Sequence, residues 1–399
     1  MKKTLLTFFA AAAVCACTYP FTPVLPDAED RPLVVEGNLL IGEQSPIRLS
    51  VVKPLSEGSV APSRDDGILS AKITVEDNAG INYPVTGSYL GGFTARMETA
   101  VPGREYRMTI YLTLPKTEQE RASEEDDPVV VEVYQTPWLK VHTAPFIGDI
   151  RFAAEEDYVQ VQATMTPSES DNPYYFWEFD ENWEEHAQYN PGYFFDLETK
   201  GYYQQDGWVN PNYYCWYKAS SREPGLYSAE RLSANRMERQ VIRSIHRTDT
   251  RFQVLYAILV RTRGISPEGY KYYGTVGRNS NLTGDLFSAM PDKVSGNILC
   301  ISDPTRSAIG FIEAVTTASK RIFIDSRYYR EALPDQREVP ELNEDYTLTD
   351  HYKSGYRPLY PGIDRNKVSG MLWCPLACID CVVNGGSKDK PDFWPNDHQ

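Results

Sequence analysis

Apolar and polar residues alternate along much of the first third of the chain. In residues 69–76, Leu, Ala, Ile and Val take every second position, and Ser, Lys, Thr and Glu take the others. The same period of two recurs in residues 47–51, 106–113 and 129–133. This period places successive side chains on opposite faces of a strand. The pattern predicts an immunoglobulin-like β-sandwich of two antiparallel sheets over residues 33–145.

A second β-rich domain is predicted over residues 146–330. Its strand signals include the alternating run 159–166 and the almost wholly apolar run 252–260, which suits a strand covered on both faces. Ser266 followed by Pro267 is a typical helix start and predicts one short helix in this region. Three further strands are expected to close it, at residues 298–302, 309–315 and 321–325.

Periodicity disappears after residue 330. Residues 331–399 are therefore expected to form an irregular, cysteine-containing tail packed on the second domain. A segment of this length without regular structure needs a covalent or packing constraint to hold it in place. The fold class expected for the whole chain is mainly β.

The first residues of the chain predict export and lipid attachment. Lys2 and Lys3 precede the short apolar run 5–14, which is too short to span a bilayer but fits a secretory signal. The sequence Val14-Cys15-Ala16-Cys17 resembles a bacterial lipobox, and Cys17 is the better lipid-anchor residue, because cleavage before Cys15 would follow bulky Val14. The prediction is a lipoprotein signal peptide over residues 1–17 and a Pro-rich tether over residues 18–32. An ordinary cleaved signal with a chance cysteine is the alternative.

The charge balance restricts the partners of the expected mature chain. Removal of Lys2 and Lys3 from the 40 basic residues leaves 38 against 55 acidic residues, a net charge of −17. Nucleic acids and anionic membrane surfaces attract basic patches, so neither is expected as a direct partner. No second run of 18 or more apolar residues is present, so contact with a membrane is expected through the lipid anchor only.

Five cysteines remain once Cys15 is cleaved off and Cys17 carries lipid: Cys215, Cys300, Cys374, Cys378 and Cys381. An exported protein resides in a compartment where disulfides persist. Five cysteines allow two bridges and one free thiol in fifteen arrangements. The spacing of the last three could suggest zinc, but a fourth ligand at suitable spacing is missing, so we expect disulfides and no metal.

The sequence contains none of the catalytic motifs H-E-x-x-H, G-x-S-x-G, P-loop or G-x-G-x-x-G, so no catalytic residue and no cofactor are expected. The nearest constellation of ionisable residues is Asp180, Glu181, Glu184, Glu185 and His186. Such a cluster could hold a divalent cation or supply the carboxylate pair of a glycosidase. The simpler interpretation is a charged sheet edge beside Trp177 and Trp183.

Aromatic residues are concentrated in residues 174–217, where 17 of 44 positions are Phe, Trp or Tyr. The segment is also rich in turn formers, so much of it is expected to be loop. Aromatic side chains on loops can stack on sugars or anchor a protein partner. Trp183, Trp208 and Tyr203 in the turn-rich part are the candidate binding surface, whereas Trp177 in the alternating run is expected in the core. The alternative is that the whole segment closes a shallow β core.

Several segments resemble domain-of-unknown-function family 4249. The most specific are C-terminal: Trp373-Cys374-Pro375, Cys378-Ile379-Asp380-Cys381, Gly385-Gly386-Ser387 and Lys390-Pro391-Asp392-Phe393-Trp394. Weaker similarity runs through Leu33-Val34-Val35-Glu36-Gly37, Cys215-Trp216 and Ser295-Gly296-Asn297-Ile298. Members are lipoproteins of Gram-negative bacteria, typically encoded beside TonB-dependent outer-membrane receptors. Cys300 lies outside the signature, so the resemblance implies that it is the free thiol and that the other four cysteines are the disulfide candidates.

The function implied by this resemblance is that of a non-enzymatic outer-membrane lipoprotein. It would assist a TonB-dependent transporter in nutrient uptake, or capture a small-molecule, glycan or peptide ligand for it. The alternative from another class is a hydrolase acting on glycan or peptide, with the Asp180–His186 cluster as its acidic site. No acidic residue directly follows Cys17, where Thr18-Tyr19-Pro20-Phe21 stands instead. The sequence therefore leaves open which face of the outer membrane the protein occupies, and the cell surface is favoured.

Overall fold

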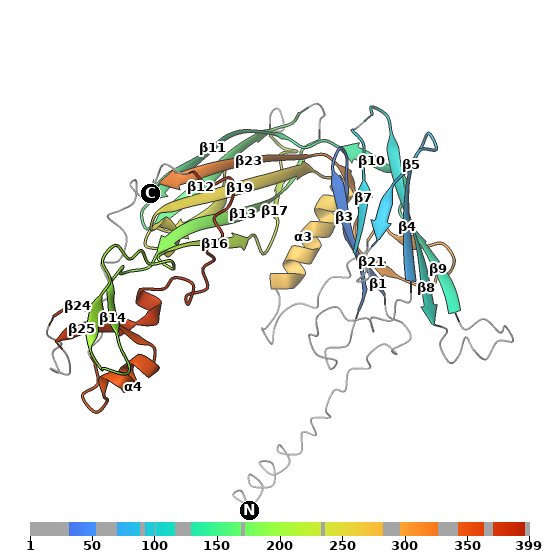
Figure 1. Cartoon of the computed structure of the whole chain (residues 1–399). Helices are drawn as coiled ribbons and strands as arrows, with labels where there is room; N and C mark the ends of the chain where they lie inside the picture. Colours follow the sequence, from blue (N-terminus) through green and yellow to red (C-terminus); the bar gives the residue numbers. More distant parts are fainter. Residues whose placement is uncertain are drawn as a thin grey trace, which may run out of the picture.

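The computed structural model describes ten segments of the chain. They are residues 32–52, 70–87, 92–99, 101–115, 129–168, 172–232, 236–281, 296–325, 342–362 and 370–395. The fold is mainly β, which confirms the expected fold class. Figure 1 shows the sheets arranged as an arch, with the N-terminal sheets at one end and a small C-terminal lobe at the other. The expected signal peptide and Cys17 lie outside the described residues.

Two sheets share the first hydrophobic core. One contains β1 (Leu33–Gly37), β3 (Gln44–Val51), β6 (Val85–Gly87), β7 (Gly92–Arg96) and β21 (Ala308–Ile309). The other contains β2 (Leu39–Leu40), β4 (Ser70–Asp77), β5 (Asn82–Tyr83), β8 (Glu105–Pro115), β9 (Val129–Gln135), β10 (Leu139–His142), β20 (Leu299–Cys300) and β22 (Ala314–Val315). Alternate residues of both sheets, such as Ile47 and Met108, are buried together. The immunoglobulin-like arrangement of these strands stays a prediction.

The chain does not divide cleanly at the predicted domain boundary between residues 145 and 146. A distant segment, residues 299–315, returns to the first two sheets and pairs with their strands. β21 runs parallel to β1, and β22 runs parallel to both β10 and β2. β20 pairs with β9. A strand is found within the predicted range 298–302, but in place of one strand over 309–315 the structure has the two short strands β21 and β22. Periodicity also carries no information about which strand will be the partner. The first core is thus built from two parts of the chain.

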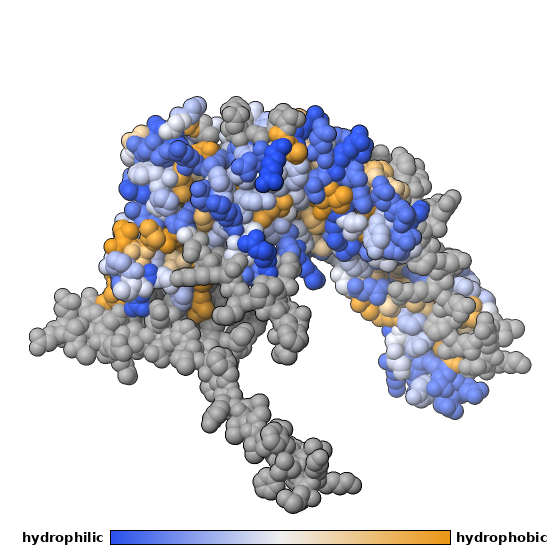
Figure 2. Space-filling view, turned by 180° about the vertical axis from the view of Figure 1, so that it is seen from behind, coloured by the Kyte–Doolittle hydropathy of each residue, from blue (hydrophilic) through white to orange (hydrophobic). Residues whose placement is uncertain are grey.

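The second pair of sheets forms the span of the arch. One sheet contains β11 (Phe146–Glu155), β12 (Tyr158–Thr166) and β18 (Met237–His246). The other contains β13 (Tyr174–His186), β16 (Tyr214–Ser220), β17 (Gly225–Ser228), β19 (Leu255–Gly264) and β23 (Thr317–Asp325). Their facing side chains, including Val161 and Ile258, form a second core. A short 3₁₀ helix, η3 (Thr250–Phe252), precedes β19. Seen from behind in Figure 2, this span carries mostly hydrophilic residues on its surface.

Helix α3 (Pro267–Asn281) lies between the first two sheets and the span. The Ser266 hydroxyl accepts the N–H of Gly269 at 2.9 Å and so caps the first turn, which is the role expected of a serine before a helical proline. The helix thereby begins at Pro267, directly after β19. No helix among the described residues is long and apolar enough to span a membrane.

The C-terminal tail is more regular than predicted. It contains α4 (Leu348–Lys353), β24 (Tyr356–Pro361), β25 (Met371–Pro375) and the 3₁₀ helix η6 (Leu376–Cys378). β24 and β25 pair with each other, and the hairpin β14 (Tyr193–Phe195) and β15 (Tyr202–Gln204) joins them in a small lobe. Trp373 and Phe195 lie in the core of this lobe. Short strands interrupted by prolines leave too little alternation for recognition from sequence.

Asp77 fixes the turn between β4 and β5. Its Oδ1 accepts the backbone N–H groups of Ala79 and Ile81, both at 2.9 Å, while Oδ2 lies 2.7 Å from the Arg104 guanidinium and accepts the Tyr83 hydroxyl. Burial alone would raise the pKa of Asp77, but these hydrogen bonds and the arginine charge together hold that pKa below its usual value. The ionised form is therefore the stabilising form.

We expect Asp77→Asn to lower the free energy of unfolding by about 1–3 kcal/mol at neutral pH. The native pKa lies below the unfolded value of about 3.9, so the stabilisation is present above that value and is lost as pH falls through the native pKa. Urea unfolding of the unmodified protein and of Asp77→Asn, between pH 7 and pH 2.5, measures the difference between their free energies of unfolding. The difference between them should shrink below about pH 4, and a difference independent of pH would contradict the role of the carboxylate.

Candidate functional site

A cavity of about 730 Å³ lies between β10 and α3, at the junction of the first two sheets with the rest of the chain. Its walls include the aromatic side chains of Trp138, Tyr272 and Phe311. The rings of Tyr272 and Phe311 are in contact, with centroids 5.1 Å apart. Small-molecule sites typically have volumes of about 300–1,000 Å³ and mainly apolar walls. This cavity is therefore the candidate functional site.

Glu313 is the buried ionisable side chain of the cavity, with only 2% of its surface exposed. Its Oε1 accepts the backbone N–H of Ser266 at 2.7 Å, and its own N–H donates to Asn38 Oδ1 at 2.9 Å. Its Oε2 is buried and has no hydrogen-bond partner in the described structure. Burial raises the pKa of Glu313, although the hydrogen bond from Ser266 acts in the opposite direction.

Gly269 allows the helix to approach this carboxyl group closely. A Cβ atom at position 269 would lie 2.7 Å from both carboxylate oxygens of Glu313, which is closer than such contacts occur. A glycine at this position lets the first turn of α3 and the carboxylate occupy neighbouring space. The positive end of the helix dipole then favours the ionised carboxylate.

Charged residues of both signs surround the cavity. Lys140, Lys271 and Glu268 are exposed side chains in its lining. His142 also lines it, and burial lowers the pKa of His142 while the nearby Glu268 partly offsets this. The imidazole is therefore neutral at pH 7. A second cavity, of about 830 Å³, lies near Pro102 and Thr316, but none of the described residues that line it is a fully buried ionisable side chain.

Sequence reasoning missed this site. Glu313 is the single charged residue in an apolar strand signal, Ile309 to Val315, and a lone charge at a core position is the signal that could have identified it. The other walls come from segments more than a hundred residues apart, Trp138–His142 and Ser266–Thr275. Only the folded chain brings them together.

The residues Asp180–His186, on which the alternative hydrolase hypothesis depends, do not form one cluster, because they lie in strand β13 and alternate between its two faces. Glu181 faces the second core, where it pairs with Arg243 at 3.0 Å and accepts the Tyr256 hydroxyl at 2.8 Å. Asp180 lies on the opposite face, 2.6 Å from Arg261. The described residues include no group of three His, Cys, Asp or Glu side chains placed to hold a metal ion.

Glu184 is also on this opposite face and is completely buried. Its Oε1 lies 2.8 Å from His186 Nε2, and its Oε2 accepts the indole N–H of Trp394 at 2.8 Å. Both oxygens are thus engaged by the strand itself and by the C-terminal segment. Glu184 joins these two parts of the chain and is not open to a substrate.

The three candidate binding aromatics do not form one surface. Trp183 lies in β13 and not in a turn-rich part, where its ring stacks on Tyr217 with centroids 5.5 Å apart. Tyr203 and Trp208 do lie together, since both contact the ring of Phe194 on the β14–β15 hairpin. Tyr203 is 54% exposed. Trp177 is buried in the second core.

Trp183→Ala should therefore destabilise the protein, by about 3 kcal/mol, because it removes a packed indole from the edge of the second core. Tyr203→Ala should change stability by no more than about 0.5 kcal/mol. Thermal melting of the two variants beside the unmodified protein compares these effects. Equal melting temperatures for the two variants would contradict the placement of Trp183.

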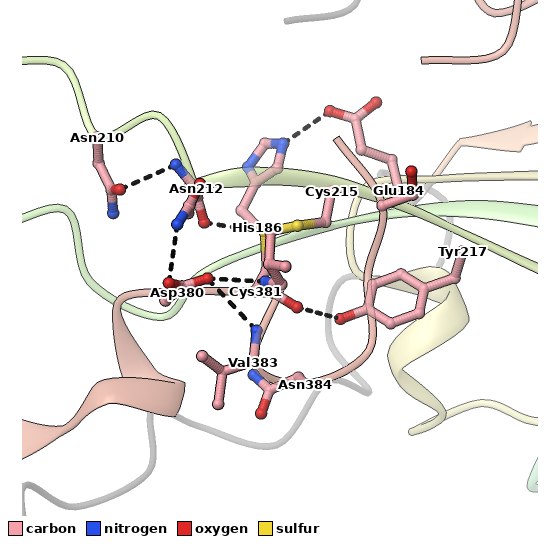
Figure 3. The surroundings of a disulfide bond; sticks show 12 residues. Glu184, His186, Asn210, Asn212, Cys215, Tyr217, Asp380, Cys381, Val383 and Asn384 are labelled. Carbon is pink, nitrogen blue, oxygen red and sulfur yellow. Dashed lines mark hydrogen bonds and ion pairs between the residues drawn. A yellow bond between two sulfur atoms is a disulfide. The ribbon is translucent and has the colours of Figure 1, made fainter. Parts of the chain in front are cut away.

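Cys215 and Cys381 form a disulfide that joins β16 to the C-terminal segment (Figure 3). The Tyr217 hydroxyl donates to the Cys381 carbonyl at 3.1 Å, and Asn212 Nδ2 donates to Asp380 Oδ2 at 2.8 Å. These contacts hold the two segments together around the bridge. Cys374 and Cys378, the other disulfide candidates, are buried free thiols, as is Cys300. The second bridge allowed by the cysteine count is therefore not formed.

The comparison with known proteins identifies a family. No curated protein matches the chain. The family described as "Domain of unknown function (DUF4249)" matches residues 18–321, about three quarters of the 399 residues. The matched range includes β1 to β22, α3 and the first part of β23, and therefore every residue that lines the cavity. The chain belongs to the DUF4249 family.

Proposed function

We propose that this protein is a non-enzymatic outer-membrane lipoprotein that captures a small ligand for a TonB-dependent transporter. The observation that carries the proposal is the cavity between β10 and α3. It combines aromatic walls with a few polar side chains, which is the composition typical of ligand-binding sites.

The position of the cavity supports ligand capture. Its walls come from the first two sheets and from α3, and the loop that carries Glu313 connects β21 to β22. The carboxyl group of Glu313 in turn contacts the start of α3 through Ser266. β10 and α3 hold the lysines of the lining, and hydrogen bonds to Ser266 and Asn38 hold Glu313 on its loop, so the site is largely formed before a ligand enters.

The arrangement of the carboxylates supports a binding protein over a hydrolase. A glycosidase needs two carboxyl groups on opposite sides of one sugar, at most about 9.5 Å apart and open to substrate. In β13, Asp180 and Glu184 share one face and Glu181 and Glu185 the other, so the two carboxyl groups of each pair are four residues, or about 13 Å of strand, apart. Asp180, Glu181 and Glu184 each contact a basic side chain of the protein itself.

The N-terminal sequence supports lipid attachment at Cys17. Two or three acyl chains on one cysteine anchor a protein stably, at about 0.8 kcal/mol per buried CH₂ group. The acidic body would then stand away from anionic lipid, because like charges repel. The outer face of the outer membrane is the location we favour, with a TonB-dependent receptor as the partner.

Cys17→Ser tests the anchored part of this proposal. The variant should appear in the soluble fraction of cells, while the unmodified protein stays with the outer membrane and needs detergent for release. Mass spectrometry of the membrane-bound protein should show a mature chain beginning at an acylated Cys17. An unmodified Cys17 in the membrane fraction would refute the lipoprotein proposal, and Cys300→Ser is the matched control, because Cys300 is buried in the fold.

A further inference from the structure

We propose that the cavity between β10 and α3 binds a small zwitterion, an apolar amino acid or short peptide, with its ammonium group on Glu313 and its carboxylate facing Lys140 and Lys271. This inference rests on the proposed function, because it names the class of ligand that the same cavity would capture. Glycans, neutral small molecules and divalent cations are the competing classes.

The first wall of the cavity is one face of β10. Trp138, just before this strand, and Lys140 and His142 within it all line the cavity. Leu139 between them is buried in the first core and also contributes to the cavity lining. This segment thus closes the core with Leu139 and offers one aromatic and one cationic side chain to a ligand.

The second wall is one face of α3. Glu268, Lys271, Tyr272 and Thr275 all line the cavity. Their spacing of three, four and seven residues from Glu268 places them on one face of the helix. Both walls therefore combine aromatic surface with a lysine, and regular structure fixes their positions.

One oxygen of Glu313, the buried carboxyl group in the cavity lining, lacks a hydrogen-bond donor. Glu313 Oε2 is buried without a partner in the described structure, and an unsatisfied buried acceptor is costly, more so when it is charged. Ser266 and the start of α3 stabilise only the other oxygen. The Arg263 guanidinium lies over the ring of Phe176 at 3.6 Å, and its charge favours the ionised form of Glu313, but it forms no salt bridge with Glu313 in the described structure. A ligand ammonium would supply the missing donor.

The exposed part of the cavity lining carries two lysines, Lys140 and Lys271, and one glutamate, Glu268. Lys140 and Lys271 are exposed, and neither takes part in a salt bridge within the described part of the chain. A ligand carrying only positive charge would meet these two lysines, and one carrying only negative charge would meet Glu313 and Glu268. A ligand that carries both charges can place each of them beside a side chain of opposite charge, and so avoids both like-charge repulsions. In the same lining, Trp138, Tyr272 and Phe311 offer apolar surface to a side chain.

The test measures binding of leucyl-phenylalanine to the full-length protein, purified in mild detergent, by isothermal titration calorimetry. The free dipeptide should bind saturably at one site. Its N-acetylated form, which has no ammonium group, should bind about 10- to 100-fold more weakly, which is the range for a lost hydrogen bond to a charged group. The C-terminal amide should also bind more weakly. No saturable binding of the free dipeptide, or equal binding of its acetylated form, would overturn the zwitterion proposal.

Glu313→Gln tests the residue itself. Glutamine keeps an oxygen for the Ser266 N–H but removes the charge, so the variant should bind the free dipeptide at least about tenfold more weakly. Glu238→Gln, at an exposed glutamate of β18, is the matched control and should bind normally. A folded Glu313→Gln protein with unchanged affinity would contradict the assignment. If this variant fails to fold, the acetylated dipeptide on the unmodified protein decides.

The dipeptide-binding test and the lipid-anchor test can each fail without the other failing. Release of Cys17→Ser from membranes does not depend on what the cavity binds. If that variant is released and leucyl-phenylalanine does not bind, the ligand class is wrong and the anchored accessory protein stands. If the dipeptide binds and Cys17 is unmodified, the site is correct and the lipoprotein proposal fails.

Discussion

Replacing Cys381 by serine is expected to lower the free energy of unfolding by about 5 kcal/mol. The bridge to Cys215 spans 166 residues of sequence, and the chain-entropy model assigns a loop of that size a stabilisation of this order. The physical reason is that the bridge restricts the unfolded chain much more than the folded one. Denaturant unfolding followed by tryptophan fluorescence measures the change.

Reduction provides the control for this prediction. A reducing agent should bring the unmodified protein to the stability of Cys381→Ser and should leave the variant unaffected. Cys215→Ser should have the same effect, and the double variant should add little, because both substitutions remove one bond. Equal unfolding midpoints for the oxidised protein and Cys381→Ser would contradict this role of the bridge.

Trp394→Ala is expected to lower stability by about 3–5 kcal/mol, although the residue lies five positions from the end of the chain. Trp394 is 3% exposed and packs with Trp216 and Leu255 on the sheet that contains β13. Its indole N–H also donates to the buried carboxylate of Glu184 at 2.8 Å. The substitution thus creates a cavity and removes a hydrogen bond to a buried charge.

Trp394→Phe separates the two contributions. The phenyl ring keeps most of the packing but cannot donate to Glu184, so this variant should lose about 1–3 kcal/mol. Thermal and denaturant unfolding of the two variants would give the order of stability: unmodified protein, Trp394→Phe, Trp394→Ala. A Trp394→Ala protein as stable as the unmodified one would show that the C-terminal segment does not contribute to the fold.

Local patterns predicted the strands well. The alternation in residues 69–76 corresponds to β4 (Ser70–Asp77), and that in residues 159–166 corresponds to β12 (Tyr158–Thr166). Each of these strands has one face in a core, and burial of one face is what produces a period of two. The start of α3 was equally visible, because capping is a local interaction within one turn.

Long-range pairing could not be predicted. Gly310 has a backbone φ of +141°, and a Cβ there would lie 2.2 Å from the Val35 carbonyl oxygen, so this glycine lets the returning segment approach β1. A glycine in a strand signal indicates a bulge or a close approach but does not name the neighbour. The same limit applies to the cysteines, where fifteen arrangements were open and the described cysteines form one bridge, Cys215–Cys381.

The candidate site was harder still to predict. Trp138, Lys271 and Glu313 carry no shared motif, and each has an ordinary structural interpretation when seen alone in the sequence. Aromatic density instead directed attention to residues 174–217, where Trp183 serves the second core. Composition records how many aromatic residues a segment holds, whereas their exposure depends on which elements cover them.

Co-extraction from the outer membrane tests the central claim most directly, namely that this protein is the partner of a TonB-dependent transporter. The full-length chain with a C-terminal tag would be extracted from its native cells in mild detergent, purified, and analysed by native mass spectrometry. The account predicts a complex with one transporter of this class in a constant ratio, absent from the Cys17→Ser strain. A lipidated protein that is consistently recovered alone, with no transporter above the level of an untagged control, would contradict it.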